Sequence, residues 1–383
     1  MRSKPLLFVA LLLVLLQCLV VYGQKTSEIK GVVFADYNYH LKSHKFGGQD
    51  RNAFSIRRIY FTFENNITAG MKMRFRLESA HGKYGATSKI HPFVKHAYLE
   101  WKNLIPRHKL YLGIAETNAF KNSEKYWGYR SVEKTIMDLN KISSSADMGI
   151  ALKGDLFGDM AHHWLTIFNG TGYGSSEVDR YKKIGYAFWM TPIAGLMIEG
   201  YADYENQDPD APQTATVFKQ ARDYNGSSEY YTVKGFLGYK HPRFTFGAEA
   251  FIRTNQESGI KDVTIADNAV AGYSKADVKR LGFSIFGSLI TPVPKLKAFS
   301  RYDYYDPNTR DDVYTRFADG QLTGGADDEY RLIIVGLDYI PQPDVHIMPY
   351  IMVKQYSQGS KERDLMARIT LYYKFNSGKI KVK

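Results

Sequence analysis

Cysteine is almost absent from this sequence, since Cys18 is the only one among 383 residues. It lies in an apolar segment near the start of the chain, and removal of that segment leaves a chain without cysteine. Disulfide bonds, a thiolate nucleophile and a cysteine-based zinc site are then excluded. A lipid-modified Cys18 is the alternative, but Gln17 before it is not the small residue that a lipoprotein signal requires.

Long apolar runs are absent beyond residue 21, because no later stretch approaches the roughly 18 apolar residues of a membrane helix. The one long run spans residues 6–21, with Arg2 and Lys4 before it and Gly23 shortly after it. This order predicts a secretory signal peptide, residues 1–23, cleaved after Gly23. An uncleaved membrane anchor is the alternative. Residues 24–383 are expected to form a single domain.

The chain is instead rich in aromatic residues and glycine, with 29 Tyr, 22 Phe and 32 Gly. Such a composition favours strands and turns over a helical fold. Residues 53–79 show the pattern most clearly, because apolar and charged residues alternate strictly from Met71 to Glu78. Successive side chains of a strand point to opposite faces. The segment therefore predicts a hairpin with one apolar face and one charged face.

The same period of two recurs along the whole chain. Strands are expected at residues 28–40, 53–64, 71–79, 93–101, 108–115, 148–156, 161–168, 183–190, 196–204, 229–240, 244–253, 278–289, 296–306, 329–340, 345–354 and 364–375. Short turns rich in Pro, Gly and Asn alternate with long polar loops, which is typical of bacterial outer-membrane barrels. The pattern predicts an all-β fold, a transmembrane antiparallel β-barrel of about 16 strands with short periplasmic turns and long extracellular loops. A soluble β-sandwich or propeller is the alternative, but the opposite faces of these strands are too charged to pack a second layer.

Three segments carry a resemblance to a known family. Residues 54–64, FSIRRIYFTFE, resemble the second strand of phosphate-selective porin O/P-like outer-membrane barrels, and residues 301–308 are similar to a late strand and loop of related porins. Residues 368–375 are similar to the aromatic-terminated signal read by the barrel-assembly machinery, although residues 376–383 follow here. The resemblance implies a porin-like barrel and a homotrimer. It does not extend to phosphate selectivity, because no run of loop arginines or lumenal lysine ladder matches.

If the apolar face points outward, the charged face lines a lumen, and a barrel of about 16 strands leaves an aqueous channel. Lys72, Arg74 and Arg76 share one strand and lie beside Arg58, which predicts a basic wall with a weak anion preference. Pairing of these residues with acidic residues across strands, at Glu64, Glu78 and Glu100, is the alternative. The residues expected to line the pore are Arg58, Lys72, Arg74, Arg76, Glu78, Glu100, Glu199, Asp203, Arg301 and Arg368.

The longest connection, residues 116–147, is expected to fold into the pore and narrow it, because loops of this length are uncommon unless functional or disordered. A short helix is predicted over residues 131–139, with Ser131 and Glu133 in its first turn. An extracellular flap is the alternative. The candidate constriction residues are Lys121, Lys125, Arg130 and Lys134.

Signs of catalysis or of metal binding are weak. His162 and His163 are adjacent, so on a strand their side chains point to opposite faces and do not share a metal ion. An acidic loop could hold calcium through oxygen ligands, at Asp306, Asn308, Asp311 and Asp312, but an ordinary solvated loop explains these residues as well. No cofactor, metal or enzymatic activity is therefore expected.

Together these features predict a porin of a Gram-negative outer membrane that passes small hydrophilic solutes by passive diffusion, with a weak anion preference. Its expected partners are outer-membrane lipid and lipopolysaccharide, the barrel-assembly machinery through Asp364–Phe375, and small hydrophilic or anionic solutes. Nucleic acid is not expected despite a formal net charge of +12, because the basic residues lie on one face of exported strands. The alternatives are a non-conducting barrel that binds or adheres through its surface loops, and a barrel-embedded hydrolase.

Overall fold

The computed structural model describes residues 26–44, 47–80, 90–177, 180–206, 229–266, 269–314, 316–318, 321–323, 329–357 and 363–381. The predicted signal peptide, residues 1–23, lies outside the described residues, and its cleavage stays a prediction. Within the described ranges, no helix combines the length and the apolar character needed to cross a lipid bilayer.

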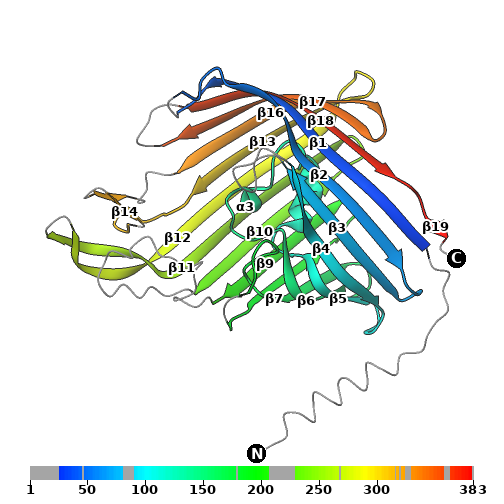
Figure 1. Ribbon diagram of the computed structural model, residues 1–383, viewed down its shortest axis with the longest axis horizontal. Helices are drawn as coiled ribbons and strands as arrows, with labels where there is room; N and C mark the ends of the chain where they lie inside the picture. Colours follow the sequence, from blue (N-terminus) through cyan, green and yellow to red (C-terminus); the bar gives the residue numbers. More distant parts are fainter. Residues whose placement is uncertain are drawn as a thin grey trace, which may run out of the picture.

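Sixteen antiparallel strands form a closed barrel in chain order (Figure 1). They are β1 (Thr26–Lys42), β2 (Asn52–Asn66), β3 (Met71–Ala80), β4 (His91–Lys102), β5 (His108–Glu116), β6 (Ala146–Asp155), β7 (Ala161–Phe168), β8 (Lys183–Met190), β9 (Leu196–Glu205), β10 (Tyr230–Lys240), β11 (Phe244–Ala266), β12 (Ala269–Ile290), β13 (Leu296–Asp306), β16 (Tyr330–Gln342), β17 (Val345–Tyr356) and β18 (Arg363–Asn376). Pairing of β18 with β1 closes the sheet, and a short strand β19 (Ile380–Lys381) continues past β18 along β1. The predicted all-β barrel is confirmed.

The two faces of each strand differ as the alternation predicts. In the opening hairpin Phe63 lies opposite Phe75, on the face turned away from Glu64 and Arg74. Apolar side chains of the outer face are exposed, and Val335 is 56% accessible. No second sheet covers this face in the described part of the chain, which excludes the β-sandwich. An apolar belt on a closed sheet without free edges suits hydrocarbon.

Short and long connections alternate, so the barrel has two different ends. The short-turn end is formed by residues 67–70, 103–107, 156–160, 191–195, 241–243, 291–295 and 343–344. The long-loop end carries the remaining connections between barrel strands.

The long-loop end contains more regular structure than the sequence predicts. The expected loop at residues 254–277 is wrong, because β11 and β12 continue through it as a two-stranded ribbon beyond the barrel (at the left in Figure 1). The apolar alternation ends there, and Glu257 and Asp262 adopt positive φ near shifts in register. The expected loop at residues 307–328 likewise contains a small hairpin, of β14 (Arg316–Ala318) and β15 (Gln321–Thr323).

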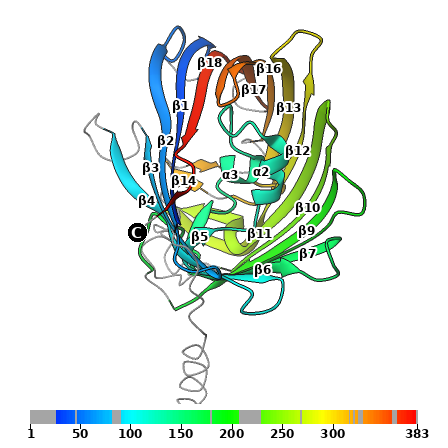
Figure 2. The ribbon, with the colours of Figure 1, turned by 90° about the vertical axis from the view of Figure 1, so that its right-hand side faces the viewer.

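The connection between β5 and β6 lies inside the barrel (Figure 2) and carries α2 (Lys121–Trp127) and α3 (Ile136–Leu139). The helix predicted over residues 131–139 is therefore wrong in its first half. Ser131 does not cap a helix, since its hydroxyl faces the sulfur of Met348 at 3.8 Å. The unpredicted helix α2 ends at Gly128, whose φ of 71° is a conformation that glycine adopts without strain.

We expect Val335→Arg to lower the free energy of unfolding in lipid vesicles by about 2–4 kcal/mol, because the guanidinium would replace an apolar side chain near the middle of the outer belt. Urea unfolding followed by tryptophan fluorescence measures this change. The matched control is Thr264→Arg on the exposed ribbon, where a change below about 0.5 kcal/mol is expected. Equal losses at the two positions would contradict a hydrocarbon-facing belt.

Candidate functional site

The inner loop, residues 117–145, packs against the barrel wall through aromatic side chains. The ring of Trp127 lies 5.4 Å from that of Phe286 on β12, and Tyr129 stacks on Phe299 of β13 at 4.4 Å, measured between ring centroids. Burying one large apolar side chain contributes about 1.5–3 kcal/mol. Five of the loop's almost fully buried apolar residues are Phe120, Trp127, Val132, Ile136 and Met137. The loop is therefore packed against the inner wall of the barrel.

Basic side chains of the wall bind the backbone of the inner loop. A loop with little regular structure leaves carbonyl groups without helix or sheet partners, and buried carbonyl groups need a donor. Cations from four strands supply these donors to five carbonyl oxygens. The bonds run from Arg57 to Val132 (2.7 Å) and Ser131, from Lys240 to Lys125 (2.8 Å), from Arg253 to Ile142 (2.5 Å), and from Arg301 to Lys134.

An ion network inside the loop surrounds Arg130. The guanidinium donates to the carboxylate of Glu124 and, at 2.5 Å, to that of Asp138, while Lys121 pairs with Glu124 at 2.9 Å. Burial alone would raise the pKa of Glu124, but the charges of Lys121 and Arg130 outweigh it and hold that pKa below its usual range. Burial would likewise raise the pKa of Asp138, but the charge of Arg130 and, to a smaller extent, that of Lys134 hold this pKa below its usual range. Both carboxylates stay ionised and keep Arg130 in place.

Two lumenal cavities meet at Phe34 and Arg130. One has a volume of about 470 Å³ and reaches toward the short-turn end, where Lys240 and Lys297 line it. The other has a volume of about 330 Å³ and reaches toward the long-loop end. Phe34 of β1 and Arg130 of the inner loop line both cavities, so the two cavities adjoin at these side chains. We call this pair the candidate constriction.

Both cavities are lined by more basic than acidic side chains. The short-turn cavity has five basic residues, Arg76, Lys125, Arg130, Lys240 and Lys297, and two acidic ones, Glu124 and Asp338. The long-loop cavity also has five, Arg57, Arg58, Arg130, Lys134 and Arg368, against Asp36 and Glu133. Among the described residues, no carboxylate lies within 4.0 Å of four cations of the short-turn cavity, Arg76, Lys125, Lys240 and Lys297. Uncompensated positive charge along a narrow lumen attracts anions.

The predicted basic wall is divided between paired and unpaired side chains. Lys72 and Arg74 both pair with Glu64, Lys72 at 3.1 Å, as the cross-strand alternative requires. Arg76 instead donates to the hydroxyl of Thr62 at 2.7 Å and borders the short-turn cavity. Each interpretation therefore describes part of the wall.

The other predicted residues are also divided. Those that border the two cavities, besides Arg76, are Arg58, Lys125, Arg130, Lys134 and Arg368, while Glu100 and Arg74 border a third cavity of about 130 Å³. The remainder border none of the three cavities and lie in ion pairs: Lys72 with Glu64, Glu78 with Arg58 and Lys95, Lys121 with Glu124, Glu199 with Lys234, Asp203 with Lys183, and Arg301 with Asp303. Alternation thus finds the lumenal face, but not whether a charge meets solvent or another charge.

Sequence reasoning did not single out Phe34 or Lys240. A signal for Phe34 existed, because it is an aromatic residue on the polar face of residues 28–40, beside Asp36. Lys240 ends a strand, where charged residues are common, and nothing in the sequence distinguishes it.

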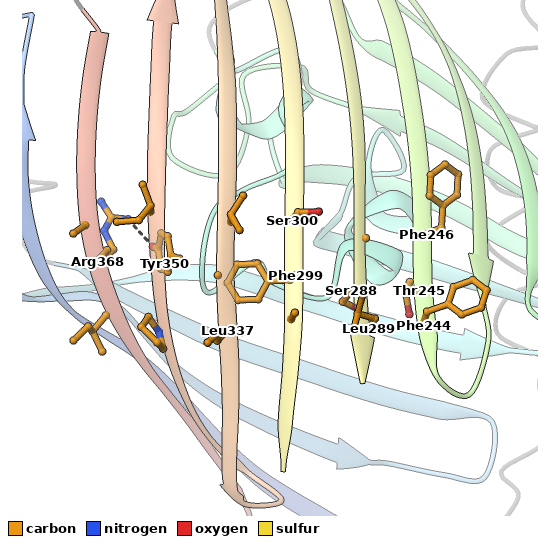
Figure 3. A pocket seen from close by; sticks show the side chains of 18 of the residues that line it. Phe244, Thr245, Phe246, Ser288, Leu289, Phe299, Ser300, Leu337, Tyr350 and Arg368 are labelled. Atoms are coloured by element: carbon orange, nitrogen blue, oxygen red, sulfur yellow. Dashed lines mark hydrogen bonds between the residues drawn. The ribbon is translucent and has the colours of Figure 1, made fainter. Parts of the chain in front are cut away.

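A larger hollow, of about 970 Å³, lies outside the lumen. Figure 3 shows it across the strands β11, β12, β13, β16, β17 and β18, with Phe244 on β11, Leu289 on β12 and Leu337 on β16. These three side chains are exposed on the apolar outer face. The hollow therefore belongs to the belt and not to the polar site.

Comparisons with known proteins show the fold of this chain. No family model and no curated protein matches the sequence. Similar solved structures include the outer membrane channel DcaP of Acinetobacter baumannii (12% identity, TM-score 0.62, 93% of this chain and 100% of that chain) and an anion-selective porin from Comamonas acidovorans (11%, 0.61, 92% and 100%). Salmonella typhi OmpF in complex with daunomycin is another (11%, 0.59, 91% and 97%). The fold is that of outer-membrane porins, whereas the resemblance to the phosphate-selective O/P family is not confirmed.

We expect the inner loop to lose protection from hydrogen exchange on acidification. A carboxyl group with a lowered pKa stabilises the fold above its ordinary pKa of about 4, and this contribution is lost as pH falls through the lowered value. In Arg130→Gln the carboxylate of Asp138 loses its main cation, and that of Glu124 keeps Lys121 but loses its second cation, so protection should be lost at higher pH. Exchange over residues 117–145, corrected for intrinsic rates, measures the shift. Identical pH profiles would contradict the role given to Arg130.

Proposed function

We propose that this chain forms a water-filled channel in a Gram-negative outer membrane and passes small hydrophilic solutes by passive diffusion, with a preference for anions. The observation that carries the proposal is the pair of basic cavities that meet at Phe34 and Arg130. The porin fold and the apolar outer belt support the location. The neighbour from Comamonas acidovorans is titled an anion-selective porin, which is in keeping with the proposed preference.

The charge of the lumen is the basis of the anion preference. At about 8 Å in a water-like dielectric, one unit charge contributes roughly 0.5 kcal/mol. Several unpaired cations then concentrate anions several-fold, while salt screens the effect over about 10 Å at 0.1 M. The preference is therefore weak and depends on ionic strength.

The inner loop is the proposed size filter. Its apolar side chains pack against the wall and its carbonyls bind wall cations, so the loop narrows the lumen without needing to move. The volumes of the two cavities, about 470 and 330 Å³, suit small solutes. Lys125, Arg130 and Lys134 of this loop line these cavities. Lys121 forms an ion pair with Glu124.

The remaining partners follow from the proposed location. Outer-membrane lipid and lipopolysaccharide would surround the apolar belt, and the barrel-assembly machinery would recognise Asp364–Phe375. A homotrimer is implied by the family resemblance. Export would require the signal peptide predicted at residues 1–23.

A non-conducting barrel that binds other molecules at its surface is the second candidate. The ribbon formed by β11 and β12 beyond the barrel favours it, because it presents a long paired surface at the long-loop end. If the lumen is closed, binding by this ribbon would be the function of the protein.

Reversal potentials in a planar bilayer under a potassium chloride gradient test the proposal. The natural protein should show discrete conductance steps and select chloride. Lys125→Glu with Lys297→Glu should shift selectivity toward potassium, because each substitution changes the local charge by two units, or about 1 kcal/mol and roughly five-fold in local anion concentration at about 8 Å. Neither side chain has a carboxylate partner among the described residues, so both should be replaceable without unfolding.

The control for this test is Lys261→Glu on the ribbon, which should leave the reversal potential unchanged. Unchanged ion selectivity in the variant with Lys125→Glu and Lys297→Glu would contradict the proposal that these cations cause the anion preference. A folded barrel that shows no conductance steps would favour the surface-binding candidate instead.

A further inference from the structure

Two histidines meet on the outer face at the short-turn end of the barrel. His108 of β5 and His163 of β7 lie in register on either side of Gly154 of β6. Because Gly154 has no side chain, the two imidazoles approach each other above it, with their Nε2 atoms 2.9 Å apart. A Cβ atom at Gly154 would lie only 2.3 Å from the ring of His108. The glycine therefore permits the contact.

The contact made by Nδ1 of His108 decides which of its two ring nitrogens carries the hydrogen in the neutral form. Its Nδ1 lies 2.8 Å from the carbonyl oxygen of Pro106, which accepts hydrogen bonds and cannot donate one. Nδ1 therefore carries the hydrogen, and Nε2 of the neutral ring presents a lone pair toward His163. A backbone carbonyl on the far nitrogen is the usual support of a histidine that ligates a metal. His163 is almost fully buried, with 8% of its surface accessible.

The distance between the two nitrogens suits particular metal ions. With metal–nitrogen bonds of about 2.05 Å, two ligands at 90° lie about 2.9 Å apart, whereas tetrahedral ligands lie about 3.3 Å apart. In the metal-free structure the 2.9 Å contact is a hydrogen bond, which Nε2 of His163 donates when His108 carries its hydrogen on Nδ1. The same separation matches adjacent positions of a square-planar or octahedral ion, which would bind once that hydrogen is displaced. Imidazole ligands in such a geometry favour Cu²⁺ or Ni²⁺.

We propose that His108 and His163 form a two-histidine site for a divalent transition metal, Cu²⁺ or Ni²⁺. The described part of the chain contains no cluster of three or more metal-ligating side chains, so water would complete the coordination. A bound ion would link β5 to β7 across β6. The site stands on the outer face and is independent of the proposed channel.

Neighbouring His162 provides a matched control. Its side chain points to the opposite face, where Nδ1 lies 2.7 Å from the carboxylate of Asp155 and the ring stacks on Trp189 at 5.2 Å. Replacing it removes one histidine from the same strand without touching the proposed ligands.

The test is titration of the full-length barrel, refolded in vesicles, with Cu²⁺ or Ni²⁺ alone, followed by calorimetry and by paramagnetic resonance of the copper form. We expect one ion per chain, coupled to two imidazole nitrogens, and a higher unfolding temperature with metal. His108→Gln and His163→Gln should weaken binding by more than the roughly ten-fold cost of losing an outer-shell partner. His162→Gln should bind as the natural protein does.

Three outcomes would overturn the site. They are no binding by the folded natural protein up to about 1 mM metal, coupling to fewer than two nitrogens, and unchanged binding in His163→Gln. Because the resonance spectrum is recorded on the natural protein, it decides the question even where a variant fails to fold.

Discussion

The backbone hydrogen bonds between β1 and β18 are the interaction on which the other features depend. They run from Lys30 opposite Asn376 to Lys42 opposite Leu365 and leave neither strand with a free edge. In hydrocarbon an unpaired N–H or C=O costs several kcal/mol, so an open sheet of this kind would not be stable there. Closure also divides every strand into an outward face and an inward face. The first can then be apolar and the second charged.

The inward face brings many charges close together, and the structure neutralises most of them. Glu64 and Glu78 each receive basic side chains from neighbouring strands. Arg57, Arg253 and Arg301 also bind loop carbonyls. An unpaired buried charge is strongly destabilising. Arg76, Lys125 and Lys297 have no carboxylate partner among the described residues, and they border a cavity, where water can solvate them. The same requirement that stabilises the barrel thus leaves a basic lumen.

Alternation located strands accurately wherever one face is apolar and the other is not. The strands expected at residues 161–168, 183–190 and 296–306 coincide with β7, β8 and β13. It failed in the ribbon at residues 254–277, which continues beyond the barrel without the apolar alternation. The residues buried there, Ile260 and Ala276, are covered by the segment around Val313, which is distant in sequence. Alternation also failed to find α2, since a seven-residue helix held by packing against Phe286 and its neighbours needs no capping signal of its own.

The period of two, by itself, determined that this chain is an all-β barrel with an apolar exterior and a charged interior, because side-chain direction in a strand depends only on local geometry. Tertiary structure alone decided which charges pair, which side chains line the cavities and which histidines meet. The partners are distant in sequence: Arg301 binds the carbonyl of Lys134 across 167 positions, and His108 meets His163 across 55. Strand register and the fold of the inner loop place these groups together, and no short-range pattern encodes either one.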